Sequence, residues 1–183
     1  MIIGIAGTIG AGKGTVVKYL KNHGFAHYSS SDILKEMLQE QGLPQTRLEL
    51  SKLADELSKQ YEGGILQLSH EHAKKDGVKD YILEAIHRES EADYIRKLGG
   101  VVLGVDADIR ERYQRSVKRQ EGEKDNVTYE EFVVNSERED DGKGSGAPNI
   151  RAVLKNADAV VYNNGTLEEL HTQIEEALKK LTY

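Results

Sequence analysis

The sequence predicts an α/β fold, with a five-stranded parallel sheet covered by helices on both faces to give three layers. Short β-branched apolar runs alternate with longer segments of helical periodicity along the 183 residues. One of these runs, residues 101–105 (VVLGV), is apolar throughout, as is typical of a parallel strand buried on both faces. The sequence contains no internal repeat and no second domain boundary, so we expect a single domain over residues 1–183.

Each element has its own local signals. Strands are expected at residues 2–6, 25–28, 81–83, 101–105 and 159–162. Helices are expected at residues 13–23, 31–41, 47–61, 65–75, 108–119, 128–138 and 166–180, with a further helix beginning at Ser90. Gly24 is a stop signal after the first helix, and the polar cluster at residues 29–32 (SSSD) supplies caps for the second.

Capping boxes mark the beginnings of three later helices. The pairs are Ser90 with Asp93, Thr128 with Glu131, and Thr166 with Glu169. Residues 31–76 form a helical insertion between the second and third strands, a candidate mobile lobe. Residues 120–126 are polar, and residues 140–149 (DDGKGSGAPN) have the composition of a linker.

Composition limits the function classes. Charged residues make up 31% of the chain and the net charge is −6, which argues against a nucleic-acid partner. The absence of cysteine excludes disulfides, thiolate catalysis and cysteine-ligated metals. No stretch approaches the roughly 18 apolar residues of a membrane span, and the apolar start lacks the basic region of a signal peptide. We expect a cytoplasmic monomer or small homo-oligomer with no membrane partner.

The motif that carries chemistry is residues 7–15, GTIGAGKGT, between the first strand and the first helix. It matches the phosphate loop GxxxxGK, with Gly14 where Ser or Thr usually stands. Glycines allow backbone N–H groups to curl around phosphates, and the following helix directs its positive end at them. Lys13 would bridge the β- and γ-phosphates of ATP, and the Thr15 hydroxyl would ligate Mg²⁺. The predicted cofactor-binding residues of this loop are Gly7, Gly10, Ala11, Gly12, Lys13, Gly14 and Thr15.

Two alternatives to this interpretation exist. A glycine-rich turn can merely link a strand to a helix, but a strand before the motif and a helix after it favour nucleotide binding. The motif alone does not separate a kinase from an NTPase switch or motor.

The motif resembles the phosphate loop of adenylate kinases and other nucleoside monophosphate kinases. Residues 28–35 (YSSSDILK) are similar to their ISTGDMLR segment, and residues 82–88 (ILEAIHR) to LDGFPR. The C-terminal third, with Arg115 to Arg119, Glu137-Arg138, ADAVV and NNGT, looks like dephospho-coenzyme A kinase. The resemblance implies a P-loop NTPase fold in which residues 31–76 bind the phosphoryl acceptor and residues 112–140 form a short lid.

The resemblance also implies roles for acidic residues. Asp32 would hold Mg²⁺-bound water or orient the acceptor oxygen, although Asp is also common as a plain helix cap. Glu84, where the family has Asp, would be the acidic partner of the metal, or an ordinary charge at a strand end. Asn164 and Gly165 would pack beside the adenine. The predicted metal set is Thr15, Asp32 and Glu84.

Basic residues complete the candidate site. Arg112, Arg115 and Arg119 share one helix face, and arginines there would stabilise the transferring phosphoryl group, although a solvated helix face has the same spacing. Arg88 could fork onto an acceptor phosphate. The predicted catalytic residues are Lys13, Asp32, Arg88, Arg115 and Arg119. The predicted acceptor-binding residues are Ser30, Lys35, Arg47 and Arg88.

These observations predict an ATP- and Mg²⁺-dependent phosphotransferase whose acceptor is a (deoxy)nucleoside monophosphate. The helical insertion and Arg88 favour a nucleotide as the acceptor, whereas the C-terminal third favours dephospho-coenzyme A. Lys35 and Glu84 stand where the kinases have Arg and Asp. A nucleotide-binding regulator or slow ATPase without a small-molecule acceptor therefore remains an alternative.

Overall fold

The computed structural model describes residues 1–119, 127–140, 142 and 148–181. The elements in chain order are β1 (Ile2–Gly7), α1 (Lys13–Asn22), β2 (Ala26–Ser29), α2 (Ser30–Glu40), α3 (Arg47–Gln60), α4 (Ile65–Lys75), β3 (Tyr81–Ile86), α5 (Glu89–Lys97), β4 (Val101–Asp106), α6 (Ile109–Arg119), α7 (Tyr129–Asp140), α8 (Ile150–Lys155), β5 (Ala159–Tyr162) and α9 (Leu167–Leu181). The predicted lid and linker fall partly outside the described residues, at 120–126, 141 and 143–147.

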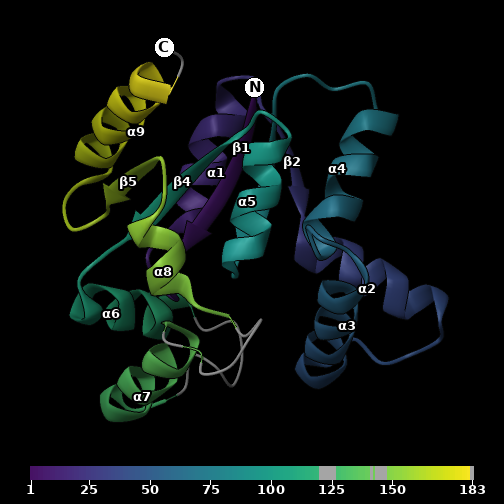
Figure 1. The fold of residues 1–183 in the computed structure, drawn as a ribbon. Helices are drawn as coiled ribbons and strands as arrows, with labels where there is room; N and C mark the ends of the chain where they lie inside the picture. The colour runs from purple at the N-terminus through teal and green to yellow at the C-terminus, as the bar shows by residue number, and fades with distance from the viewer. Residues whose placement is uncertain (120–126, 141, 143–147, 182–183) are drawn as a thin grey trace.

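The sheet has five strands in the order β2-β3-β1-β4-β5, and every neighbouring pair is parallel. This confirms the predicted parallel sheet. β1 is the central strand, so the loop that follows it opens at the middle of the edge where all five strands end (Figure 1). Ligands of open α/β sheets bind at this edge.

Helices cover both faces of the sheet. On one face, α1 and α9 bury Leu20 and Ile174 against Ile5 and Ile82. On the other face, α4, α5 and α8 pack on strand residues such as Leu83. The alternation of side chains along each strand supplies both faces with apolar residues, which gives the three-layer arrangement that the sequence predicts.

The insertion between β2 and β3 consists of α2, α3 and α4. These helices share an apolar cluster of their own, which includes Leu34, Leu38, Leu53, Leu57 and Ile65. In Figure 1, α2 and α3 lie to the right of the sheet, whereas α6 and α7 lie below it on the left. The two groups of helices therefore flank the edge where the strands end.

Two of the three predicted capping boxes are confirmed. Thr128 N–H donates to Glu131 Oε2 at 2.8 Å, and Thr166 N–H donates to Glu169 Oε2 at 2.7 Å. The third prediction was wrong, because α5 begins at Glu89 and its capping carboxylate belongs to Glu91 rather than to the predicted Asp93.

Two further differences from the sequence prediction concern element boundaries. β3 continues to Ile86, three residues beyond its predicted end. The short helix α8 was not predicted; its N-cap is Asn149, whose Oδ1 accepts from Ala152 N–H at 2.9 Å. Six residues are too few for helical periodicity to be read.

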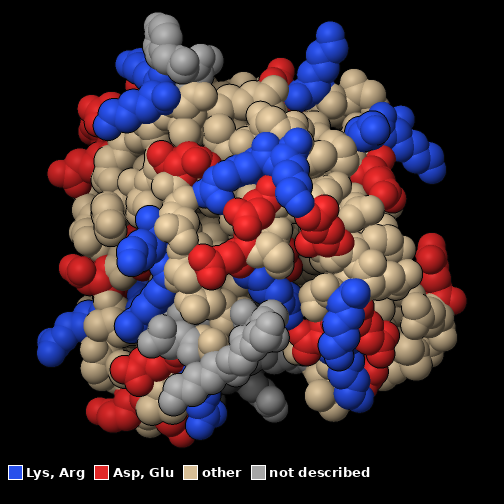
Figure 2. All heavy atoms as spheres, in the orientation of Figure 1, with Lys and Arg blue, Asp and Glu red and all other residues tan. Residues whose placement is uncertain are grey.

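The surface is mixed in charge. On the face shown in Figure 2, basic and acidic side chains are interspersed, and its described residues form no extended basic patch of the kind that binds nucleic acid. Of the described helices, none is both long enough and apolar enough to cross a membrane.

Candidate active site

The loop between β1 and α1 depends on two glycines. Gly10 and Gly12 have φ angles of 77° and 101°, in the region that side chains disfavour. A Cβ on Gly10 would lie 2.4 Å from the Arg112 carbonyl oxygen, and one on Gly12 would lie 2.3 Å from Asn163 Nδ2. Gly14, in contrast, has no neighbouring atom within 4 Å of such a Cβ. The geometry therefore requires glycine at positions 10 and 12 and leaves open space for a side chain at position 14.

A pair of matched variants tests this geometry. Gly12→Ala is expected to abolish measurable ATP binding, because the new Cβ meets Asn163 and strains the backbone at positive φ. Gly14→Ala is expected to weaken ATP binding far less, because its Cβ meets no protein atom within 4 Å, and to stabilise α1 by about 0.4–1 kcal/mol. Calorimetric titration with ATP and urea unfolding measure the two effects. Wild-type ATP affinity in Gly12→Ala would contradict the requirement for glycine.

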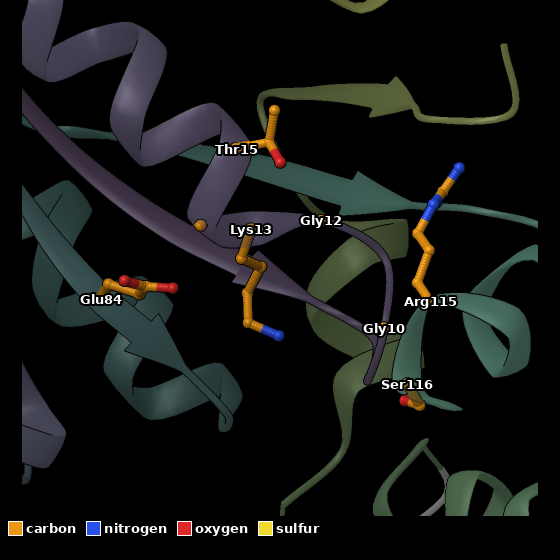
Figure 3. Close-up of a pocket in the computed structure, with 8 residues that line it drawn as sticks. Gly10, Gly12, Lys13, Thr15, Glu84, Arg115 and Ser116 are labelled. Atoms are coloured by element: carbon orange, nitrogen blue, oxygen red, sulfur yellow. The ribbon is translucent and has the colours of Figure 1, made fainter. Parts of the chain in front are cut away.

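The lysine of the motif reaches back over the loop. Lys13 Nζ donates to the carbonyl oxygens of Gly7 at 2.8 Å and Thr8 at 3.3 Å. It lines a cavity of about 510 Å³ at the loop. Figure 3 shows Lys13 pointing into the hollow of the loop, with Glu84 on the β3 side and Arg115 on the α6 side. The residues that line the cavity are Gly10, Gly12, Lys13, Gly14, Thr15, Glu84, Arg115 and Ser116.

On the α6 side of the cavity, some buried polar groups are unsatisfied by the described residues. Arg115 Nη2 donates to the Asn163 carbonyl oxygen at 2.7 Å, while Arg115 Nη1 and Ser116 Oγ are buried and have no hydrogen-bond partner among the described residues. Buried polar groups are nearly always satisfied in folded proteins. Together with a lysine, a hydroxyl and a carboxylate, these groups fit a polyphosphate with its divalent cation.

Contacts across the sheet hold the loop in place. Asn163, which follows β5, donates from Nδ2 to the Ala11 carbonyl oxygen at 2.9 Å. Asp106, at the end of β4, accepts on Oδ1 from the Thr8 hydroxyl at 2.7 Å and from the Ala107 N–H at 2.9 Å. The loop is therefore fixed to the two strands on one side of β1.

Most residues of the predicted loop meet at the cavity, together with Glu84 and Arg115. Gly7 and Ala11 belong to the same loop without lining the cavity: Gly7 accepts a hydrogen bond from Lys13 and Ala11 accepts one from Asn163. The structure thus brings together residues from the β1–α1 loop, α1, β3 and α6.

Asp32 and Lys35 are not brought to the cavity. The Asp32 side chain is 66% exposed and lies 3.2 Å from Lys35 Nζ, one helical turn along α2. Its backbone N–H donates to Ser29 Oγ at 3.3 Å, so Ser29, and not Asp32, caps the helix. An exposed ion pair of this kind contributes little to stability.

Arg88 is also absent from the cavity lining. Its side chain is buried, with Nη2 2.7 Å from Asp55 Oδ1 and Nη1 3.3 Å from Glu91 Oε1. It thereby connects α3 of the insertion to the start of α5. Ser30, at the start of α2, is buried, and in the part of the chain that the structure describes its Oγ has no hydrogen-bond partner.

Four predicted residues remain. Arg47 begins α3 and Arg119 ends α6, but both side chains lie outside the described part of the structure. Asn164 accepts on Oδ1 from the Asp108 N–H at 2.8 Å, and the exposed Gly165 follows it. The β5–α9 loop therefore contacts the start of α6.

Sequence reasoning missed Asp106, Ser116 and His27, and it included Asn163 only as part of the segment 163–166 that the resemblance places beside the adenine. An acid directly after a buried strand was the available signal for Asp106, since that strand's carboxyl end lies at the ligand edge. Ser116 lies one turn from Arg112 on the helix face already singled out for its arginines. His27, whose Nε2 lies 2.9 Å from Glu84 Oε2, gave no sequence signal.

A central strand, a glycine loop and a helix that begins with lysine define a P-loop nucleotide-binding domain. The chain belongs to the AAA domain family, whose model matches residues 3–140. It is 29% identical over 182 residues to a UPF0200 protein of Sulfurisphaera tokodaii, covering 98% of this chain and 97% of that one. It is 27% identical to a UPF0200 protein of Methanothermobacter thermautotrophicus, covering 99% and 90%.

Solved structures share the fold. TT1252 from Thermus thermophilus has a TM-score of 0.60 at 20% identity, covering 100% of this chain and 98% of that one. Dephospho-CoA kinase from Campylobacter jejuni has a TM-score of 0.57 at 16% identity, covering 98% and 96%. Shikimate kinase from Bacteroides thetaiotaomicron has a TM-score of 0.59 at 10% identity, covering 100% and 99%. The predicted P-loop fold, in its kinase-like form, is confirmed.

Proposed function

We propose that the protein is an ATP- and Mg²⁺-dependent phosphotransferase whose acceptor is a small molecule, with a (deoxy)nucleoside monophosphate as the first candidate. The observation that carries the proposal is the convergence of Lys13, Thr15, Glu84 and Arg115 on one cavity of about 510 Å³ at the glycine loop. This volume lies within the roughly 300–1,000 Å³ of small-molecule sites.

Each of these residues would have its own role in binding ATP and Mg²⁺. Loop N–H groups and Lys13 bind the phosphates, and Arg115 offsets charge on the opposite side. Thr15 and Glu84 would hold Mg²⁺ or its waters. Within the described ranges, no group of three or more His, Asp and Glu could hold a metal without a ligand's help. ATP would supply the phosphoryl group, and positioning and charge are what this kind of transfer demands of a protein.

The acceptor would enter from the side of the helical insertion. Ser29 at the end of β2 pairs in register with Glu84, so the start of α2 adjoins the acidic side of the cavity. The Ser30 hydroxyl, for which the described ranges offer no hydrogen-bond partner, lies at this point. Arg88 is engaged by Asp55 and Glu91, so the support for a nucleotide acceptor comes from the insertion rather than from Arg88.

A second candidate acceptor is dephospho-coenzyme A. The contact that favours it is the link from Arg115 through Asn163 to the loop, since both residues belong to segments that resemble dephospho-coenzyme A kinase. The two candidates differ in size, because dephospho-coenzyme A carries a long pantetheine arm beyond its nucleotide.

One assay tests the proposal and separates the candidates. ADP release from ATP and Mg²⁺ is measured with nucleoside monophosphates, deoxynucleoside monophosphates and dephospho-coenzyme A in turn. Strong stimulation by one class, with the phosphorylated product identified by mass spectrometry, is the expected result. A slow rate that no acceptor changes would contradict the proposal and favour a regulator or ATPase.

A further inference from the structure

His27 and Glu84 form a pair between two neighbouring strands. His27 Nε2 lies 2.9 Å from Glu84 Oε2, and each side chain is 19% exposed. In the register of β2 and β3, His27 lies opposite Ile82 and Ser29 lies opposite Glu84. Because side chains two residues apart share a face of a sheet, His27 and Glu84 lie on the face of Ile82. That face is the one covered by α1, the helix of the glycine loop.

Glu84 is the one acid among the described residues that line the cavity. A glutamate has three rotatable side-chain bonds, and ordering such a side chain costs conformational entropy. A hydrogen bond from His27 to Oε2 restricts this freedom and leaves Oε1 to meet a ligand. An unrestrained carboxylate would instead be able to pair with Lys13 across the cavity, which would compete with phosphate binding.

We propose that His27 is a positioning residue, which holds the Glu84 carboxylate in the orientation that Mg²⁺ or its bound water needs. The proposal rests on the proposed function of the cavity as an Mg²⁺–ATP site. Carboxylates at metal sites are commonly held by such hydrogen bonds, and loss of the partner typically lowers metal affinity or activity by about 10–100-fold. His27 itself does not line the cavity, so its action is through Glu84.

A pair of matched variants tests the hydrogen bond itself. The amide nitrogen of a glutamine at position 27 reaches roughly as far as imidazole Nε2, whereas that of an asparagine falls short. His27→Asn is expected to raise the Mg²⁺ concentration for half-maximal turnover, or to lower kcat, by about 10–100-fold. His27→Gln is expected to recover most of the loss. His72→Ala, an exposed histidine on α4, is the control and is expected to match the wild type.

A second readout is independent of turnover. In the protein without nucleotide, the ¹⁵N resonances of the His27 ring are expected to show a proton on Nε2, and Glu84→Ala is expected to remove this preference. Mg²⁺-dependent ATP binding by calorimetry is expected to weaken in His27→Asn and not in His27→Gln. Circular dichroism and thermal unfolding establish that the variants are folded.

The outcomes separate this proposal from the proposed function. If the wild type transfers phosphate and His27→Asn has the same Mg²⁺ dependence, the positioning role is wrong and the cavity assignment stands. Equal impairment of His27→Gln and His27→Asn would also overturn the positioning role. A merely structural role does not depend on whether the amide nitrogen reaches Glu84. If the wild type binds no Mg²⁺–ATP, both proposals fall, even where the ¹⁵N resonances show the pair.

Discussion

Replacing Lys13 with alanine is expected to reduce phosphoryl transfer from ATP by at least about 10²–10³-fold. Lys13 is the one lysine that lines the cavity among the described residues, and its ammonium group lies over the loop carbonyls. Its charge is positioned to offset the negative charge that spreads over the transferring group, an interaction stronger in the transition state than in the bound ground state. The effect should therefore fall mainly on kcat.

The measurement is steady-state ADP release at saturating acceptor, with ATP binding followed separately by calorimetry. Lys18→Ala is the matched control, since Lys18 is an exposed lysine on the same helix and does not line the cavity. Both variants are expected to unfold at wild-type temperature within a few degrees, because neither side chain belongs to the core. Wild-type turnover in Lys13→Ala would remove the basis for the proposed site.

Much of the fold is encoded locally. The helix predicted at residues 65–75 is observed as Ile65–Lys75, because a run of apolar residues at helical spacing faces the sheet and glycines precede it. The cap of α5 was mispredicted because Glu91 is held in place by burial and by the N–H groups of His87 and Arg88. A local pattern at Ser90 and Asp93 carries no information about that burial.

In the candidate site, too, the part formed by contiguous residues could be predicted and the contacts between distant segments could not. The glycine loop and Lys13 could be predicted because phosphate binding there depends on contiguous residues. The contacts of Thr8 with Asp106, of Ala11 with Asn163 and of Glu84 with His27 could not, since they depend on the pairing of β1 with β4, of β4 with β5 and of β3 with β2. Strand order is set by packing of the whole chain, and no segment of the sequence contains it.

Arg88 also takes its position from contacts that are distant in the sequence, and these contacts keep it away from the predicted acceptor site. Its place after β3 suggested an acceptor-binding arginine, but its side chain is only 9% exposed and its guanidinium group lies between Asp55 and Glu91. Glu91 is only 2% exposed, and burial raises the pKa of its carboxyl group while Arg88 opposes that rise. Arg88 and Glu91 thus form a buried ion pair in which each charge compensates the other.

Replacing Arg88 with alanine is therefore expected to lower the free energy of unfolding by about 3 kcal/mol, because Glu91 would be left buried without its cation. Removing Arg88 raises the pKa of Glu91 further in the folded state. The loss is then largest above that raised pKa, and it shrinks as the pH falls below it and through the ordinary glutamate pKa of about 4.3, below which the carboxyl is neutral in both states. Urea unfolding at neutral and acid pH measures both effects.

Two comparisons make this test specific. Arg96→Ala removes a more exposed arginine that pairs with Asp93 and Asp158, and is expected to cost no more than about 1 kcal/mol. Adding Glu91→Gln to Arg88→Ala is expected to recover part of the stability, because a neutral amide is less costly to bury than an unpaired carboxylate. If Arg88→Ala instead unfolds like the wild type but loses only acceptor-dependent turnover, Arg88 binds the acceptor as the family resemblance implies, and the ion pair is not structural.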